Sequence, residues 1–132
     1  MSVVVGYIPT PEGTAALNRA VEEARQRDAH LVVVNSSRGS SHPDKHYLDE
    51  SGTSALDEKL KAAGVEHTLL QQLGDVDAGE EVLNSAERYH ADLIVIGLRH
   101  RTPVGKLIMG STAQRILLEA PCPVLAVKAD YS

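Results

Sequence analysis

Two kinds of hydrophobic pattern alternate along this chain of 132 residues. Short continuous runs of β-branched and other apolar residues predict strands that are buried on both faces. These runs lie at 3–5, 31–34, 93–96 and 124–127. A fifth run, 66–73, is more polar, which predicts a strand at an edge of the sheet.

Between the strands, apolar residues recur at the three- and four-residue spacing of amphipathic helices. The helical segments span 12–28, 54–63, 77–90 and 111–119. Gly64 is placed to end the second helix, and Glu80, Glu81 and Glu87 are expected on the solvated face of the third. Such alternation predicts parallel strands joined by right-handed crossovers, with helices on both faces. We therefore expect an α/β fold in which residues 1–132 form one doubly wound, Rossmann-like domain, with a mostly parallel sheet of five strands and four helices.

Residues 37–50 are polar and rich in turn formers, which predicts a flexible surface loop. His42 and His46 in this segment are interpreted as solvated side chains, because a metal needs further ligands. The single Cys122 excludes an internal disulfide and is expected to serve in packing.

Composition and charge exclude several classes of protein. The formal net charge of −5 argues against non-specific binding of nucleic acid. No apolar run approaches the roughly 18 residues of a membrane span, and the N-terminus lacks the charged region and cleavage site of a signal peptide. We expect a cytoplasmic protein that binds neither nucleic acid nor membranes.

The most informative segment, 97–112, follows a buried strand and leads into the last helix. Its glycines permit close backbone approach, the start of the helix offers free N–H groups and a positive dipole, and the hydroxyls of Ser111 and Thr112 can donate to oxygen. Arg99, His100, Arg101 and Lys106 add positive charge. In a doubly wound sheet the ligand lies beyond the carboxyl ends of the strands where their order reverses, here the first and fourth strands. These features predict a phosphate site, although the same glycines also suit a tight connection and Ser111 also suits a helix cap.

Two common phosphate motifs are excluded. A Walker loop needs Ser or Thr after Gly-Lys, but Leu107 follows Lys106, and a Rossmann fingerprint needs three spaced glycines after the first strand, where only Gly6 stands. We also find no paired carboxylates, metal-ligand set or Ser-His-Asp arrangement, so we do not expect an enzyme.

The spacing of Gly97, Gly110 and Ser111 resembles the G-x2-G-x9-G-S/T motif of nucleotide-binding universal stress proteins. The resemblance covers nearly the whole chain, including the ending 120–128. It implies a strand order of 3-2-1-4-5 and a regulatory stress-response protein that binds ATP or AMP with Mg²⁺ and hydrolyses ATP slowly at most. The nucleotide-binding positions that it implies are Ile8, Pro9, Thr10, Ser36, Ile96, Gly97, Arg99, His100, Gly110, Ser111 and Thr112.

Three departures from the family pattern fall at these positions. His100 replaces the middle glycine, Ile8 stands where the family usually has an Asp that holds the adenosine, and Ser36 replaces a small apolar residue. A second interpretation therefore stays open, a dimeric interaction module of the same family that binds no nucleotide.

The last strand is short and apolar, and an unprotected apolar edge favours pairing with another chain. The resemblance implies a homodimer in which this strand pairs antiparallel with its copy. Val124, Leu125 and Val127 would form the contact.

Overall fold

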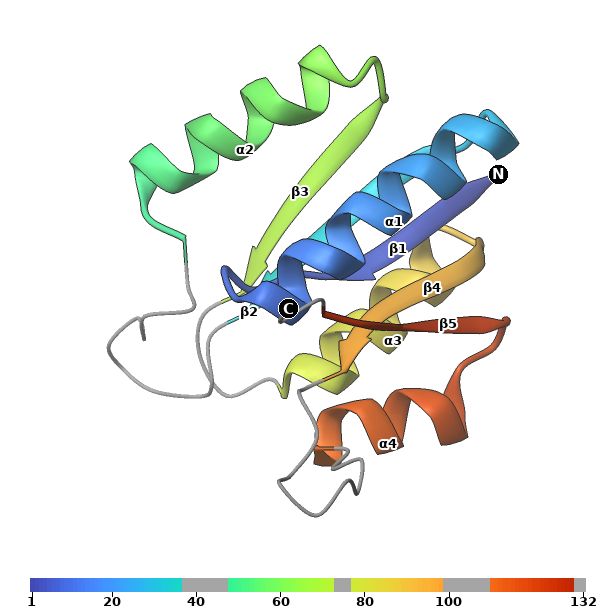
Figure 1. The fold of residues 1–132 in the computed structure, drawn as a ribbon. Helices are drawn as coiled ribbons and strands as arrows, with labels where there is room; N and C mark the ends of the chain where they lie inside the picture. The colour runs from blue at the N-terminus through green and yellow to red at the C-terminus, as the bar shows by residue number, and fades with distance from the viewer. Residues whose placement is uncertain (37–47, 73–76, 99–109, 130–132) are drawn as a thin grey trace.

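The structure, a computed structural model, describes residues 1–36, 48–72, 77–98 and 110–129 (Figure 1). Strands and helices alternate along these ranges. In chain order they are β1 (Ser2–Gly6), α1 (Pro11–Arg27), β2 (His30–Ser36), α2 (Glu50–Ala62), β3 (His67–Gln72), α3 (Ala78–Arg88), β4 (Ala91–Leu98), α4 (Ser111–Glu119) and β5 (Val124–Lys128).

The five strands form one sheet in the order β3-β2-β1-β4-β5, and every neighbouring pair is parallel. This confirms the predicted α/β fold, the strand order and the position of the polar strand β3 at an edge. The sheet is fully parallel rather than mostly parallel. The order of the strands reverses between β1 and β4. The connection from β1 leads to β2 on one side, and the connection from β4 leads to β5 on the other side.

Helices α1 and α2 cover one face of the sheet, and helices α3 and α4 cover the other (Figure 1). On one face Val3 and Val5 of β1 pack with residues of α1 and α2, and on the other Val4 packs with residues of α3 and α4. Burial of both faces explains the continuous valine run, since each fully buried Val contributes roughly 1.5–3 kcal/mol. None of the described helices combines the length and the apolar character that crossing a bilayer requires.

Helix α2 begins at Glu50, four residues before the predicted start. Asp49 caps it, because its Oδ1 accepts a hydrogen bond of 2.7 Å from the Gly52 N–H. The end of the predicted loop 37–50 therefore belongs to the helix start, with Leu48 packed against the core. Residues 37–47 lie outside the described residues.

The prediction for Glu81 is wrong. This side chain is 5% exposed rather than solvated. Helix α3 is buried over a wide arc that also includes Val82 and Ser85, because it lies on β1, β2 and β4 and against α4. The sequence-based prediction took only the apolar residues of the helix as buried, and they cover a narrower part of its surface than the part that is buried in the structure.

Candidate functional site

The carboxyl ends of β1 and β4 lie side by side, with Val5 in register with Val95. The Tyr7 N–H donates to the Val34 carbonyl at 2.9 Å, so the segment after β1 continues along β2 before α1 begins. The turn 7–10 therefore lies at the carboxyl edge of the sheet, at the reversal of strand order. The ends of the strands and the starts of α1, α3 and α4 are gathered on this side of the molecule (Figure 1).

Gly97 lies in β4 where the first turn of α1 packs onto the sheet. A Cβ on Gly97 would overlap the backbone carbonyl of Glu12 and would lie 2.7 Å from its carbon, inside the 3.0 Å that real Cβ atoms keep. No other residue fits unless α1 moves. Gly97 therefore has a packing role that needs no ligand.

Gly110 has a different environment. It is the N-cap of α4 with φ −70°, which any residue can adopt, and no described atom lies within 4 Å of a Cβ built on it. Neither the backbone nor the described packing explains a glycine here. No described side chain caps α4, so the N–H groups of its first turn have no such acceptor. Among the described residues, the N-terminus of α4 thus has unfilled space beside its N-cap and no side-chain acceptor, and a helix N-terminus of this kind suits an anion.

The two hydroxyl residues after Gly110 lie in different surroundings. Ser111 is exposed, whereas the Thr112 carbonyl and Cγ2 lie 3.5 and 3.6 Å from a Cβ built on Gly79 in the first turn of α3. The starts of α3 and α4 therefore touch. Arg115 joins them further, with Nη1 3.3 Å from Asp77 Oδ2.

The turn after β1 is held by α1 itself. The Thr10 hydroxyl caps this helix by accepting a hydrogen bond of 3.0 Å from the Gly13 N–H, and the Thr10 N–H donates to the Ile8 carbonyl at 2.8 Å. Ile8 is half-buried and Pro9 is exposed. Thr10 thus has a clear structural task, and a cap hydroxyl still keeps its own proton to donate.

A buried amide side chain at this edge, Asn35, and its partly buried partner Gln71 were missed by the sequence analysis. Asn35 is 0% exposed, and its Nδ2 donates to the Tyr7 carbonyl at 3.1 Å. Its Oδ1 accepts hydrogen bonds from the Leu48 N–H at 2.9 Å and from Gln71 Nε2 at 3.2 Å. The available signal was a polar residue directly after the apolar run of β2, at the end of the sheet where ligands bind.

Other predicted site residues are placed less favourably or not at all. Ile96 is 5% exposed and packs in the core on the side of α3 and α4, and Ser36 ends β2 in register with Gln72. Arg99 and His100 lie outside the described residues, as do Arg101 and Lys106. The structure therefore brings together Ile8, Pro9, Thr10 and Gly97 at one edge, beside the strand that leads to Gly110.

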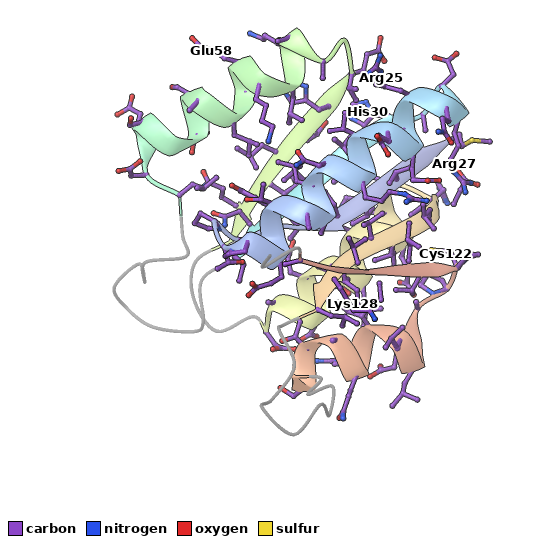
Figure 2. The ribbon with its side chains drawn as sticks, viewed as in Figure 1. Arg25, Arg27, His30, Glu58, Cys122 and Lys128 are labelled. Carbon is purple, nitrogen blue, oxygen red and sulfur yellow. The ribbon has the colours of Figure 1, made fainter. Side chains whose placement is uncertain are left out.

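One basic residue near this edge was not singled out from the sequence. Lys128 is exposed and in register with Leu98, at the carboxyl end of β5. Figure 2 shows Lys128 at one end of β5 and Cys122 near the other. Burial raises the pKa of the half-buried Cys122 thiol, and the negative charge of Asp92 adds to this shift. Cys122 thus lies near the end of β5 that is farther from the candidate site. Its raised pKa keeps the thiol protonated at neutral pH.

Among the residues that the structure describes, no three His, Cys, Asp or Glu side chains gather in a group that could hold a metal ion.

Comparison with known proteins assigns the family. Residues 1–128 match the family model described as the universal stress protein family. The chain is 45% identical to a universal stress protein of Mycolicibacterium smegmatis over 126 residues, which cover 96% of each chain.

Two solved structures from Archaeoglobus fulgidus share the fold. One, a universal stress protein, has a TM-score of 0.79 at 28% identity and covers 97% of this chain and 98% of that one. The other, a universal stress protein in complex with dAMP, has a TM-score of 0.71 at 24% identity with the same coverage. The family model, the relative and the fold agree that this chain belongs to the universal stress protein family.

Proposed function

We propose that this chain is a regulatory protein that binds an adenine nucleotide, ATP or AMP, at the carboxyl ends of β1 and β4. The observation that supports the proposal is the environment of Gly110: no described atom lies within 4 Å of a Cβ built on it, and no described side chain caps the helix that begins there. Phosphate oxygens accept hydrogen bonds from such N–H groups and gain from the positive end of the helix dipole. The exposed Ser111 would add its hydroxyl.

The electrostatics of the neighbouring helix are compatible with an anion. Asp77 is the N-cap of α3, and Glu80 and Glu81 lie in its first turn. Arg115 of α4 lies 3.3 Å from Asp77 and 4.0 Å from Glu80, so it offsets part of this negative charge beside the site. Arg99 and His100, together with Lys128 at the end of β5, would add positive charge to the same region.

The environment of the nucleoside differs from that of the phosphates. A relative with this fold was solved with dAMP, which supports an adenine nucleotide as the ligand. Ile8 has no carboxylate for a ribose hydroxyl, so phosphate contacts supply most of the affinity. We expect ATP to bind more tightly than AMP, and AMP more tightly than adenosine. Mg²⁺ enters with the phosphates, and hydrolysis is slow at most, because phosphoryl transfer needs a positioned nucleophile as well as bound phosphates.

The test is a calorimetric titration of Mg²⁺-ATP into the purified chain, after absorbance has excluded bound nucleotide. Gly110→Ala and Gly110→Val place increasing bulk in front of α4, and we expect a graded loss of affinity that reaches tenfold or more, about 1.4 kcal/mol, with Val. Saturable heat that both variants retain unchanged would place the phosphates elsewhere. Absence of heat in the wild type would leave the interaction module as the better account.

That second candidate, a homodimeric interaction module, is favoured by β5. In the described structure β5 pairs only with β4, in a register that sets Val124 opposite Ile94. The Ile94 N–H donates to the Pro123 carbonyl at 3.0 Å, so in a parallel ladder the N–H and C=O groups of Val124 and Ala126 point away from β4. We propose that two copies pair through this edge, with Val124, Leu125 and Val127 at the contact.

The dimer contact can be tested in two ways. Val127→Lys should give a monomer in sedimentation equilibrium, but Val127 also packs against the core of its own chain, so this variant can lose stability as well as the contact. A substitution chosen from the strand register tests the contact alone. Ala126→Pro removes an outward N–H and leaves the bonds to β4 in place, because proline is tolerated where the N–H of an edge strand faces solvent. Ala126→Thr, which keeps the N–H, is the matched control. A proline variant that dimerises with wild-type affinity would place the interface elsewhere.

A further inference from the structure

Asn35 is a fully buried amide at the carboxyl end of β2, with both ends of its side chain in use. Its Oδ1 receives two N–H donors, from Leu48 at 2.9 Å and Gln71 at 3.2 Å. An oxygen must face these donors, so Nδ2 faces the Tyr7 carbonyl at 3.1 Å. The orientation of the amide is therefore determined by its partners and not by an arbitrary choice of atoms.

Gln71 and Leu48 hold Asn35 in this orientation. Gln71 Nε2 also donates to the Leu48 carbonyl at 2.9 Å, and Gln71 Oε1 accepts from the Thr53 hydroxyl at 3.4 Å. Both backbone groups of Leu48 are thus satisfied by side chains of the sheet, immediately before the cap of α2. A satisfied buried network of this kind specifies one arrangement.

The Tyr7 carbonyl is the first link to the candidate nucleotide site. The Tyr7–Ile8 peptide is planar and trans, so holding its carbonyl also orients the Ile8 N–H. The Ile8 carbonyl accepts from the Thr10 N–H at 2.8 Å and lies so close to Gly13 that no Cβ would fit there. The turn is therefore held between Asn35 on one side and α1 on the other.

We propose that Asn35 is a positioning residue for the nucleotide site: its bond to the Tyr7 carbonyl sets the turn 7–10, which forms one wall of that site. This inference rests on the proposed nucleotide binding. Asn35 acts through the backbone of Tyr7 and Ile8, so it affects affinity without touching the ligand.

The experiment compares two variants of the same network. Asn35→Asp keeps an acceptor for Leu48 and Gln71 but loses the donor to the Tyr7 carbonyl. Gln71→Glu loses the donors to Leu48 and Asn35 and keeps the acceptor for Thr53. The Leu48 N–H still donates to Asn35 Oδ1 in this variant, which keeps Nδ2 turned to the Tyr7 carbonyl. Calorimetry with AMP should show about a tenfold loss of affinity for Asn35→Asp and less than about a twofold loss for Gln71→Glu, while urea unfolding shows both to be less stable than the wild type.

A pH series separates positioning from general loss of stability. In Asn35→Asp the new carboxyl can donate to the Tyr7 carbonyl once it is protonated, and burial favours the protonated form. The ratio of variant to wild-type dissociation constants should therefore fall between pH 8 and pH 5. For Gln71→Glu the ratio should stay near one.

The possible outcomes distinguish a failure of the positioning role of Asn35 from a failure of the proposed nucleotide binding. If the wild type binds AMP and Asn35→Asp binds it equally well, or as poorly at pH 5 as at pH 8, the positioning role is wrong. If Gln71→Glu loses as much affinity as Asn35→Asp, the network acts only through stability. If the wild type binds neither AMP nor ATP, the proposed function falls and the role of Asn35 falls with it. Should far-UV circular dichroism show Asn35→Asp unfolded, Asn35→Ser replaces it, because its hydroxyl is too short to reach Tyr7, and the same comparison with Gln71→Glu applies.

Discussion

Gly97→Ala tests whether a glycine of the predicted phosphate-binding segment is needed for the fold in the absence of any ligand. The added methyl group would overlap the Glu12 carbonyl and lie 2.7 Å from the carbonyl carbon. The obstacle is backbone in the first turn of α1, so no side chain can rotate away and the helix itself must shift. Overpacking of this kind costs about 2–3 kcal/mol. For a domain of this size each kcal/mol lowers Tm by about 3–5 °C, so we expect a decrease of roughly 6–15 °C.

The assay is urea unfolding followed by circular dichroism, without nucleotide. We expect a lower midpoint with an unchanged m-value, which marks a loss of stability rather than a change of the unfolded state. Gly110→Ala is the matched control, because no described atom lies within 4 Å of its added methyl group. Its cost should stay below about 1 kcal/mol, the usual difference between Gly and Ala at an N-cap. Equal midpoints for Gly97→Ala and wild type would refute the packing of α1 on β4 described above.

Three further predictions concern the cap of α1, the contact between α2 and β3, and the thiol. Thr10→Ala removes the acceptor for the Gly13 N–H and should lower the free energy of unfolding by about 1 kcal/mol in urea titrations; an unchanged midpoint would contradict the cap. Hydrogen bonds from His67 and Lys61 hold the pKa of the Asp57 carboxyl below its usual value. The stabilisation is therefore present at neutral pH and lost as pH falls through this lowered pKa, so Asp57→Asn should be less stable than wild type at pH 7, with a gap that closes below about pH 4. A gap of constant size from pH 7 to pH 3 would exclude Asp57 as its source. The raised pKa of Cys122 should make its alkylation by iodoacetamide at pH 8 slower than that of an unstructured cysteine peptide, and an equal or faster rate would show a more exposed thiolate.

Local pattern was enough to predict most of the fold. The continuous valine run of β1 and the apolar run of β4 indicated strands buried on both faces, and the polar residues of β3 indicated an edge. These predictions succeeded because side-chain periodicity reports burial directly. The start of α2 was predicted four residues too late, because its cap, Asp49, lies in a polar stretch that also suits a loop.

For the candidate site too, some features follow from the sequence and others only from the tertiary structure. The sequence by itself supplies the spacing of Gly97, Gly110 and Ser111 and the alternation of strand and helix patterns. These features predicted the family and the parallel sheet, which are confirmed, and an edge of the sheet for a ligand, which stays a prediction. Only the tertiary structure distinguished the two glycines, since Gly97 lies against Glu12 of α1, whereas no described atom lies within 4 Å of a Cβ built on Gly110.

The buried residues with polar side chains were decided by tertiary structure as well. Asn35 meets Tyr7, Leu48 and Gln71, and Glu81 becomes buried where α3 lies on the sheet. Each of these environments is made by segments that are distant along the chain and adjacent only after folding. The local sequence pattern predicts which face of a strand or helix is buried. It does not predict which atoms of other segments will contact a given residue after folding.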